Sequence, residues 1–239
     1  MQANTFSYSG SELDAMAEAR NYYKWILRIA GPFIGSNVVE VGAGMGNFAA
    51  ALLQDVPVSE LLLVEPAENL FPGLARRFEA DARVKVLKGY FGEGVCSREM
   101  DSIIAVNVIE HIRDDSAFLH TAFGALAPGG SVVLFAPALD ILYGSLDASF
   151  EHYRRYSKPQ LAGKLTQAGF RLEKIRYINF AGILTWFLAG RILRRKTLRP
   201  GQVRLYDRWV VPWASRIEQF WNPPLGQSLL AIGRRPRAV

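Results

Sequence analysis

The chain has 239 residues, of which 50% are hydrophobic and 21% are charged, so it can bury a full core and is not a disordered protein. Its single cysteine, Cys96, excludes an internal disulfide and a cysteine-based metal cluster, and is typical of a cytoplasmic protein. Residues 1–151 carry 10 Lys/Arg and 19 Asp/Glu, whereas residues 152–239 carry 18 and 3. The basic second half indicates an anionic partner, although a solvated basic face is the simpler alternative.

The segment Met1–Asn4 contains no basic region followed by an apolar core, so we expect no signal peptide. Further along, five apolar segments of strand length alternate with helical segments. They occupy residues 38–42, 61–65, 84–87, 101–106 and 131–136. This alternation predicts a parallel sheet with helices on both faces, which is a doubly wound α/β fold.

The first of these strands ends in the sequence Gly42-Ala43-Gly44-Met45-Gly46, which a helical segment follows. Alternating glycines allow a tight turn and a close approach to a ligand at the free N–H groups of the helix. The spacing G-x-G-x-G differs from the G-x-G-x-x-G of dinucleotide-binding proteins. Glu40, two residues before the first glycine, would repel a diphosphate and favours a cationic amino-acid group.

The second strand ends at Glu65, about 20 residues beyond the glycine turn. An acidic residue at this position suits the two hydroxyls of a ribose. Pro66 follows it and is expected to start the next helix, at the position that proline tolerates best. Taken alone, Glu65 is better explained as an ordinary charged residue where a strand leaves the sheet, but together with the glycine turn it favours ribose binding.

Two further motifs follow in chain order. Residues 101–107 form a buried-strand pattern that leads into Val108-Ile109-Glu110-His111-Ile112, and Asp114-Asp115 would begin the next helix. The sequence Leu126-Ala127-Pro128-Gly129-Gly130 predicts a turn before the strand at 131–136.

These four motifs, in this order over residues 38–137, resemble those of class I S-adenosylmethionine (SAM)-dependent methyltransferases. The resemblance implies SAM as cofactor and S-adenosylhomocysteine (SAH) as product, with Glu40 facing the methionine end and Glu65 binding the ribose. It also implies an N-terminal helix around Arg20–Trp25 that closes over the cofactor, although core packing explains its aromatic residues equally well. The cofactor contacts expected on this basis are Tyr22, Trp25, Glu40, Gly42, Ala43, Gly44, Gly46, Asn47, Phe48, Glu65, Pro66, Gly89, Tyr90, Asn107 and Val108.

Many relatives carry an acidic residue after the third strand, where it binds the adenine amino group. Here the chain reads Lys88-Gly89-Tyr90-Phe91-Gly92, so we expect the backbone or Tyr90 to contact the adenine.

The same resemblance adds two later strands, near Arg171–Tyr177 and Ser228–Gly233, the last of them antiparallel. The fold is then a Rossmann-like, seven-stranded sheet with a helical, basic and aromatic insertion before the last strand. We divide the chain into an N-terminal helical cap (1–35), a SAM-binding core (36–178), a substrate-side insertion (179–226) and a last strand with its tail (227–239). An insertion of about 50 residues is too long for a plain loop.

The insertion contains the uncharged run Phe180–Gly190, directly before Arg191, Arg194 and Arg195. The run is shorter than the roughly 20 residues that span a bilayer. Tryptophan and arginine beside an apolar run suit the surface of an anionic membrane, which places the protein in the cytoplasm at the inner membrane face. A hydrophobic lid over the active site and a homodimer interface are the alternatives. Nucleic acid is disfavoured, because the aromatics cluster with aliphatic residues and no RNA-binding signature is present.

A last motif, Ser145–Ser157, contains the sequence E-H-Y-R-R-Y-S and resembles a segment of bacterial methyltransferases linked to surface-polysaccharide and glycosyltransferase pathways. His152 is the candidate general base, and His111 is expected to line the junction of cofactor and acceptor. Both histidines could instead be structural. The candidate substrate contacts are Tyr153, Arg154, Arg155 and Tyr156, of which the arginines suit an anionic group. Ser157 is expected to cap the next helix.

The expected reaction is an in-line transfer of the methyl group from SAM to a small or amphiphilic acceptor, such as a lipid-linked sugar or isoprenoid, with no metal required. A soluble small-molecule acceptor and a SAM-binding module without catalysis are the alternatives. A nicotinamide-dependent oxidoreductase is disfavoured by the glycine spacing and by Glu40.

Overall fold

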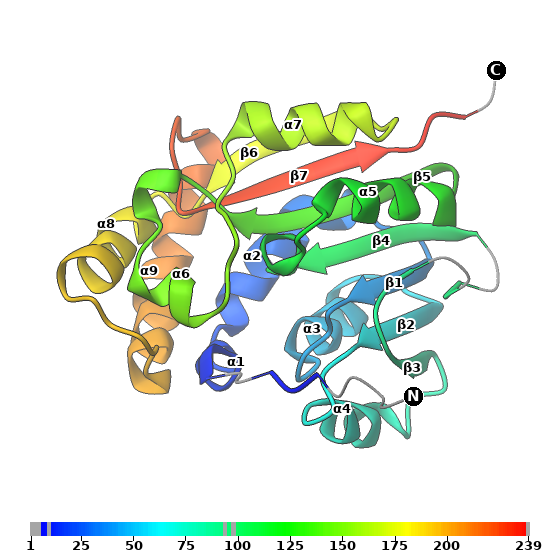
Figure 1. The fold of residues 1–239 in the computed structure, drawn as a ribbon, viewed down its shortest axis with the longest axis horizontal. Coiled ribbons are helices and arrows are strands. Elements are labelled where there is room, and N and C mark those ends of the chain that lie inside the picture. Colours follow the sequence, from blue (N-terminus) through cyan, green and yellow to red (C-terminus); the bar gives the residue numbers. More distant parts are fainter. Residues whose placement is uncertain (1–5, 9–10, 93–94, 97–98, 238–239) are drawn as a thin grey trace.

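The computed structural model describes residues 6–8, 11–92, 95–96 and 99–237, so Met1–Asn4, the basis of the signal-peptide prediction, lie outside the described residues. The strands are β1 (Asn37–Val41), β2 (Glu60–Glu65), β3 (Val84–Lys88), β4 (Met100–Val106), β5 (Leu126–Pro137), β6 (Arg171–Ile178) and β7 (Ser228–Arg234). They form a seven-stranded sheet in the order β3-β2-β1-β4-β5-β7-β6 (Figure 1). Only β7 runs antiparallel to its neighbours, β5 and β6, so the predicted sheet is confirmed.

The helical segments lie before β1 and between the strands. They are α1 (Ser11–Met16), α2 (Arg20–Ala30), η1 (Gly31–Phe33), α3 (Asn47–Asp55), α4 (Phe71–Phe78), η2 (Ile109–His111), α5 (Asp115–Ala125), η3 (Asp140–Leu142), α6 (Ser145–Ser149), α7 (Lys158–Gln167), α8 (Gly182–Phe187), the π-helical turn η4 (Leu188–Ile192) and α9 (Pro200–Phe220). The predicted helix start at Asp114-Asp115 is confirmed, since Asp114 caps α5 by accepting a hydrogen bond from the Ala117 N–H. The predicted cap at Ser157 is confirmed too, because Ser157 caps α7 together with Gln160.

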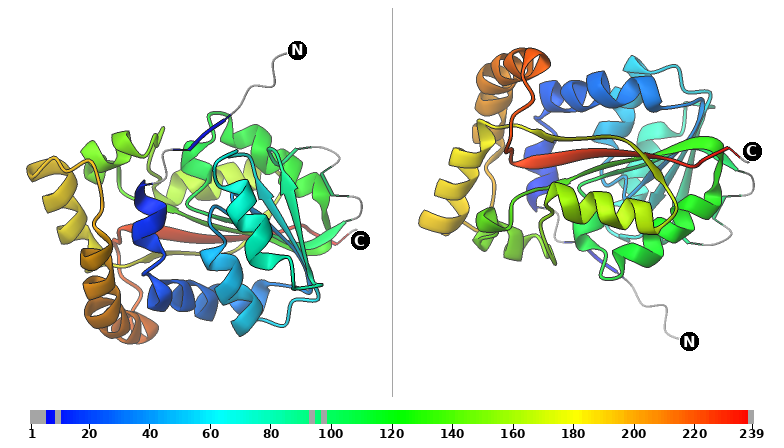
Figure 2. Two further views of the ribbon diagram at one scale, coloured as in Figure 1. Left: turned by 90° about the horizontal axis from the view of Figure 1, so that it is seen from below. Right: turned by 90° about the horizontal axis from the view of Figure 1, so that it is seen from above.

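Helices cover both faces of the sheet (Figure 2), and a hydrophobic cluster lies on each face. Along β5, Val132 and Leu134 join one cluster and Val133 and Phe135 the other, because successive side chains of a strand point to opposite faces. The first cluster packs against α5 and α7, and the second packs against α2, α3, α4 and α9. Burial on both faces explains why these strands read as continuous apolar runs.

Two local expectations were wrong. Pro66 does not start a helix, because the carboxylate of Glu65 accepts a hydrogen bond from the Ala67 N–H and holds a turn there, and α4 begins only at Phe71. Strand pairing in β5 begins at Leu126, opposite Met100, five residues before the predicted start. The predicted bend is nevertheless present, since Gly129 has φ +88°.

The insertion between β6 and β7 folds into α8, η4 and α9, at the left end of the molecule in Figure 1. Asp207 of α9 reaches across to α2, whose own N-cap residue provides no side-chain hydrogen bond. Its carboxylate accepts from the N–H groups of Asn21 (3.0 Å) and Tyr22 (2.9 Å). The first turn of α2 therefore depends on a residue that follows it by 185 positions. No helix in the described part of the chain has the length and apolar character needed to cross a bilayer.

We predict that Asp207→Ala lowers the free energy of unfolding by about 1–3 kcal/mol, because it leaves two N–H groups of α2 without their acceptor. Arg216→Ala, at an exposed position of the same helix, is the matched control and should change the stability by less than about 0.5 kcal/mol. Denaturant unfolding of both variants measures the difference. Equal stability of the two variants would contradict a capping role for Asp207.

Candidate functional site

The glycine turn that follows β1 has a backbone conformation that requires glycine. Gly42, Gly44 and Gly46 have φ values of +65°, +56° and +75°. A Cβ atom on Gly42 would lie 2.6 Å from Cγ2 of Val108, and one on Gly46 would lie 2.5 Å from Cε2 of Phe78. Gly46 also serves as the N-cap residue of α3, so the turn directs its backbone toward a helix N-terminus.

Glu65 holds this turn against the neighbouring strand. Its carboxylate accepts hydrogen bonds from the Gly44 N–H (2.7 Å) and the Ala67 N–H (2.9 Å). The side chain is buried, which raises its pKa, while the two N–H donors act in the opposite direction. A carboxylate has about four lone-pair positions, so two remain for a vicinal diol.

Glu40 lies within β1, below the turn. It is buried, and its Oε2 has no hydrogen-bond partner. Burial, and secondarily the nearby Glu65, raise the pKa of Glu40 to about 8. A buried carboxylate without a partner is unfavourable unless a cation or a donor is supplied. This arrangement suits the positively charged methionine end of SAM.

The N-terminal residues cover the turn. The carbonyl of Phe6 accepts from the Glu68 N–H, and Tyr8 exchanges two hydrogen bonds with the side chain of Asn69, in the turn after β2. Leu13 of α1 lies over Gly44, with its Cδ2 atom 3.4 Å from where a Cβ would stand. These segments close one side of the cofactor region.

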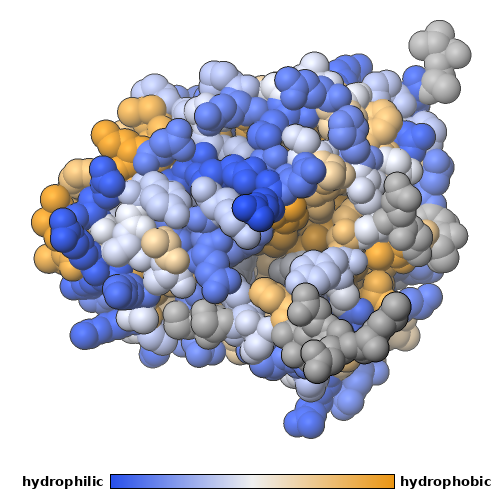
Figure 3. All heavy atoms as spheres, viewed as in Figure 1, coloured by the Kyte–Doolittle hydropathy of each residue, from blue (hydrophilic) through white to orange (hydrophobic). Residues whose placement is uncertain are grey.

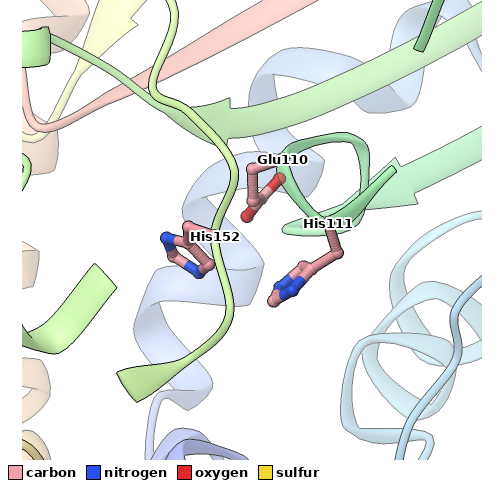
Figure 4. Close-up of side chains that lie close together, drawn as sticks. All are labelled: Glu110, His111 and His152. Carbon is pink, nitrogen blue, oxygen red and sulfur yellow. The ribbon is translucent and has the colours of Figure 1, made fainter. Parts of the chain in front are cut away.

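A cluster of Glu110, His111 and His152 lies at the same edge of the sheet (Figure 4). Glu110 and His111 belong to η2, directly after β4, and His152 follows α6. One ligand atom from each of the three side chains lies within 4.8 Å of the others. The two imidazole rings meet edge to face, with centroids 4.7 Å apart. The structure thus brings together the two predicted catalytic histidines, which are 41 residues apart in the sequence.

Asp147 orients His152 from behind. Its Oδ1 atom lies 2.9 Å from Nδ1 of His152 and 2.8 Å from Nε of Arg155. Its Oδ2 atom accepts from Nε1 of Trp186 (3.2 Å) and from the Gly144 N–H (3.1 Å). These partners outweigh burial and lower the pKa of Asp147. An ionised Asp147 fixes the proton of His152 on Nδ1, which leaves the Nε2 lone pair for chemistry.

Burial lowers the pKa of His111 to about 3, and the neighbouring His152 acts in the same direction. His111 is therefore neutral at physiological pH. Burial also raises the pKa of Glu110 to about 7, although His152 opposes it. The cluster consequently places the neutral imidazole of His111 beside the buried carboxyl of Glu110, with the Asp147–Arg155 pair behind them.

Several expected contacts have internal partners instead. Tyr22, Trp25 and Phe48 lie in the hydrophobic core, where Tyr22 packs edge to face against Phe135, and Phe48 against Tyr23. The core-packing alternative therefore describes their positions. Their role as cofactor contacts stays a prediction.

The four predicted substrate contacts also separate into two groups. Arg154 donates to Asp115, and so does the hydroxyl of Tyr156, which is 1% exposed. Arg155 is paired with Asp147 in the interior. These internal partners argue against direct substrate contact by these three side chains, whereas Tyr153 is 56% exposed and stays a candidate.

The remaining cofactor candidates lie around the glycine turn and its neighbours. Ala43 donates to the Val64 carbonyl, Gly89 donates to the Glu65 carbonyl, and the side chain of Asn47 accepts from Arg77. Asn107 is exposed at the end of β4 with φ +52°, and Tyr90 is exposed after β3. Their contacts with SAM, and that of Pro66, stay predictions.

Sequence reasoning missed Asp147, Glu110 and Tyr8. Asp147 precedes His152 by five residues within the motif that was singled out, and Glu110 adjoins His111, so both signals were present. Tyr8 contacts the ring of His111, at 5.8 Å between centroids, only because the N-terminal segment folds back over the site. No local pattern indicates that contact.

Comparisons with known proteins agree with this geometry. A family model described as a methyltransferase domain matches residues 8–175. The ubiquinone biosynthesis O-methyltransferase of Xanthomonas axonopodis pv. citri is 26% identical over 161 residues, which cover 59% of this chain and 65% of that protein. A probable S-adenosylmethionine-dependent methyltransferase of Mycolicibacterium smegmatis is 27% identical over 149 residues, which cover 61% and 56%. The chain therefore spans less than two thirds of the length of these relatives.

Solved structures share the fold at low sequence identity. The putative methyltransferase in complex with the Trm112 activator of Haloferax volcanii superposes with a TM-score of 0.64 at 16% identity, covering 96% of this chain and 95% of that one. Phosphoethanolamine N-methyltransferase 2 of Haemonchus contortus, in complex with SAM, gives a TM-score of 0.58 at 17% identity, covering 94% and 57%.

We predict that the free energy of unfolding of Glu40→Gln, compared with that of the unmodified chain, increases as the pH rises from 5 to 9. The carboxyl of Glu40 has a pKa of about 8 in the folded state and about 4.3 when unfolded, so only the folded state holds its proton in that interval. The unmodified chain therefore loses stability with rising pH, and the glutamine variant lacks this term. Denaturant unfolding at pH 5 and pH 9, without cofactor, measures it. A stability difference that is constant with pH would contradict the buried, protonated carboxyl.

Proposed function

We propose that this chain, which belongs to the methyltransferase-domain family and has the class I SAM-dependent fold, transfers a methyl group from SAM to a hydroxyl of an amphiphilic acceptor. The observation that carries the proposal is one continuous arrangement at a single edge of the sheet. The cofactor turn, the Glu110–His111–His152 cluster and the basic, apolar insertion follow one another there. Open α/β sheets place their ligands at this edge.

The reaction needs little from the protein beyond orientation, because the sulfonium of SAM activates its own methyl group. The new C–O bond forms as the S–CH₃ bond breaks in line with it, and SAH leaves. The acceptor hydroxyl also has to lose its proton. Nε2 of His152 faces the cluster, because Asp147 engages Nδ1, so His152 is the group that acts on this hydroxyl.

An oxygen acceptor is favoured by two arguments. The relative named for ubiquinone biosynthesis is an O-methyltransferase, as its name states. The cluster also supplies imidazole and carboxyl groups, which a hydroxyl requires for activation and an already nucleophilic amine needs less.

The amphiphilic character of the acceptor is argued from the insertion. Leu205, Trp209, Trp213, Ile217 and Phe220 follow one another at helical spacing on α9, and each is exposed, by 42% to 90%. The opposite side of the helix is buried. Figure 3 shows further hydrophobic side chains gathered at the end of the molecule formed by α8. We call Leu205, Trp209, Trp213, Ile217 and Phe220 the α9 stripe.

The charges on the insertion support an anionic membrane as the occupant of this face. Asp207 and Glu218 are buried, so in residues 179–226 every exposed charge is positive. The eight basic residues are Arg191, Arg194, Arg195, Lys196, Arg199, Arg204, Arg208 and Arg216. Each basic residue near an anionic bilayer contributes roughly 1 kcal/mol. Indole and arginine side chains together suit the headgroup region.

The insertion is also connected to the cluster. Trp186 of α8 donates to Asp147, which holds His152. A groove lined by Ser145, Phe187, Arg191, Ile192 and Arg194 lies between the start of α6 and η4. Its pairing of two arginines with apolar side chains suits an acceptor that has an anionic group and a lipid chain, such as a lipid-linked sugar or isoprenoid.

The acceptor class is tested with SAM that carries a radiolabelled methyl group, incubated with a membrane lipid extract or with a water-soluble metabolite extract. We expect label in the organic phase after incubation with lipid. Label only in the aqueous products would indicate the soluble-acceptor alternative and contradict the amphiphilic acceptor. Binding of SAM without transfer to either extract would favour a binding module.

We predict that His152→Ala lowers the rate of methyl transfer by about 100-fold or more, because the acceptor hydroxyl loses the group that activates it. The variant should bind SAH within twofold of the unmodified chain. His120→Ala, at an exposed position of α5, is the control and should keep full activity. Initial rates and calorimetric SAH titrations measure both. Full activity of the His152 variant would exclude its catalytic role.

We predict that the chain binds vesicles containing anionic lipid at low salt, and that the paired change Trp209→Ser and Trp213→Ser weakens this binding by tenfold or more. Co-sedimentation at two salt concentrations measures it, and binding should fall at high salt. Leu87→Ser, on β3 at the opposite end of the molecule, is the control. No vesicle binding, or a dimer that the paired change dissociates, would refute membrane docking of the α9 stripe.

A further inference from the structure

We infer that Glu110, His111 and His152 bind a divalent transition-metal ion, of which Zn²⁺ is the simplest case. Two imidazoles and one carboxylate form a known ligand set for Zn²⁺ and for Fe²⁺. Ligand atoms bound at about 2.1 Å in a tetrahedral arrangement lie about 3.4 Å apart. The three side chains already place these atoms within 4.8 Å of one another, so small side-chain rotations would close the site (Figure 4).

The strongest sign of a missing partner is Glu110. The residue is 0% exposed, and neither of its carboxylate oxygens has a hydrogen-bond partner. Burial of a polar group without a partner is unfavourable, and native proteins rarely leave both oxygens of a carboxyl in that state. In Figure 4 the carboxyl of Glu110 points toward the two imidazoles. A cation bound between them would satisfy it.

The second feature is the set of groups behind the ligands. Metal-binding histidines almost always donate their other ring N–H to a carboxylate or a backbone carbonyl. His152 has Asp147 at its Nδ1 atom (2.9 Å). In this ring one nitrogen is thereby committed to the protein, and Nε2 is left for the ion.

The backbone also fixes the two ligand segments to one another. The N–H of Tyr153 donates to the carbonyl of Glu110 (2.9 Å), and the hydroxyl of Tyr156, which donates to Asp115, lies 3.2 Å from the carbonyl of Ile109. Glu151, directly before His152, has φ +61°. A left-handed conformation at a non-glycine residue is unfavourable and persists only where surrounding contacts impose it.

This inference deepens the proposed function and rests on it for the identity of the acceptor. Three protein ligands leave at least one position on the ion open, as in catalytic zinc sites. An acceptor hydroxyl bound there would lose its proton to water more easily and attack the methyl group of SAM as an alkoxide-like oxygen. With the ion bound, Nε2 of His152 is a ligand and the ion activates the hydroxyl; without the ion, Nε2 of His152 is the base, so loss of His152 lowers the rate of transfer in either case. A bound ion differs from the expectation that no metal takes part, which stays a prediction.

The chain offers a favourable experiment, because it contains only three histidines, and the third, His120, is exposed on α5. The untagged full chain, freed of metal with a chelator, is titrated with Zn²⁺ by calorimetry and with Co²⁺ by visible absorption. We expect one ion per chain. Glu110→Gln, His111→Ala and His152→Ala should each weaken binding by 100-fold or more, and His120→Ala should leave it unchanged.

Asp147→Asn extends the test beyond the ligands and should weaken Zn²⁺ binding by 10-fold to 100-fold, because it no longer orients His152. Each variant is also titrated with SAH, so that loss of the fold is separated from loss of the ion. The d–d absorption of Co²⁺ bound at this site reports a low coordination number. If the three side chains had only a structural role and bound no ion, this absorption would not appear. Glu110→Gln preserves the shape of the side chain and is the decisive variant.

Absence of stoichiometric binding, or equal binding by Glu110→Gln, would overturn the metal site. So would loss of binding in His120→Ala. If the metal-free chain methylates its acceptor at the full rate, a catalytic ion is excluded while the proposed function stands. If the ion binds as expected and no acceptor is methylated, the proposed function fails and the metal site remains.

Discussion

The parallel arrangement of β1, β2, β4 and β5 is the constraint on which the site depends, because it brings their carboxyl ends to one edge of the sheet. The glycine turn leaves β1 there, Glu65 ends β2, and η2 follows β4. Residues separated by dozens of positions thereby become neighbours. The hydrogen bond from the Gly44 N–H to the Glu65 carboxylate, at 2.7 Å, shows this most directly, since it joins the carboxyl ends of the adjacent strands β1 and β2.

Two buried carboxylates, those of Asp207 and Asp147, connect the insertion to the rest of the fold. Asp207 joins α9 to the first turn of α2, and Asp147 joins α6, the His152 segment and Trp186. In each case one side chain accepts more than one hydrogen bond and joins segments that are separate in the sequence. The insertion is therefore attached both to the N-terminal helix α2 and to the segment that carries His152.

Much of the fold could be predicted from the sequence, because its determinants are local. The apolar strands, the alternating glycines and the caps at Asp114 and Ser157 each depend on a few consecutive residues. The contacts made by Asp147, Tyr8 and Asp207 could not be predicted, since each joins segments whose proximity arises only in the folded chain. The prediction that a helix starts at Pro66 was wrong for a related reason. The side chain of Glu65 accepts a hydrogen bond from the Ala67 N–H, and this bond holds a turn in place of a helix.

Binding of SAM at the glycine turn, with Glu65 on the ribose, is the central claim, and calorimetric titration of the purified chain with SAM, SAH and NAD tests it most directly. The geometry predicts micromolar binding of SAM and SAH and none of NAD, because Asn47 stands where the third glycine of G-x-G-x-x-G would admit a pyrophosphate. Glu65→Ala and Gly44→Val should each abolish the two affinities. Binding of NAD, or unchanged SAM binding in both variants, would contradict the assignment of the cofactor site.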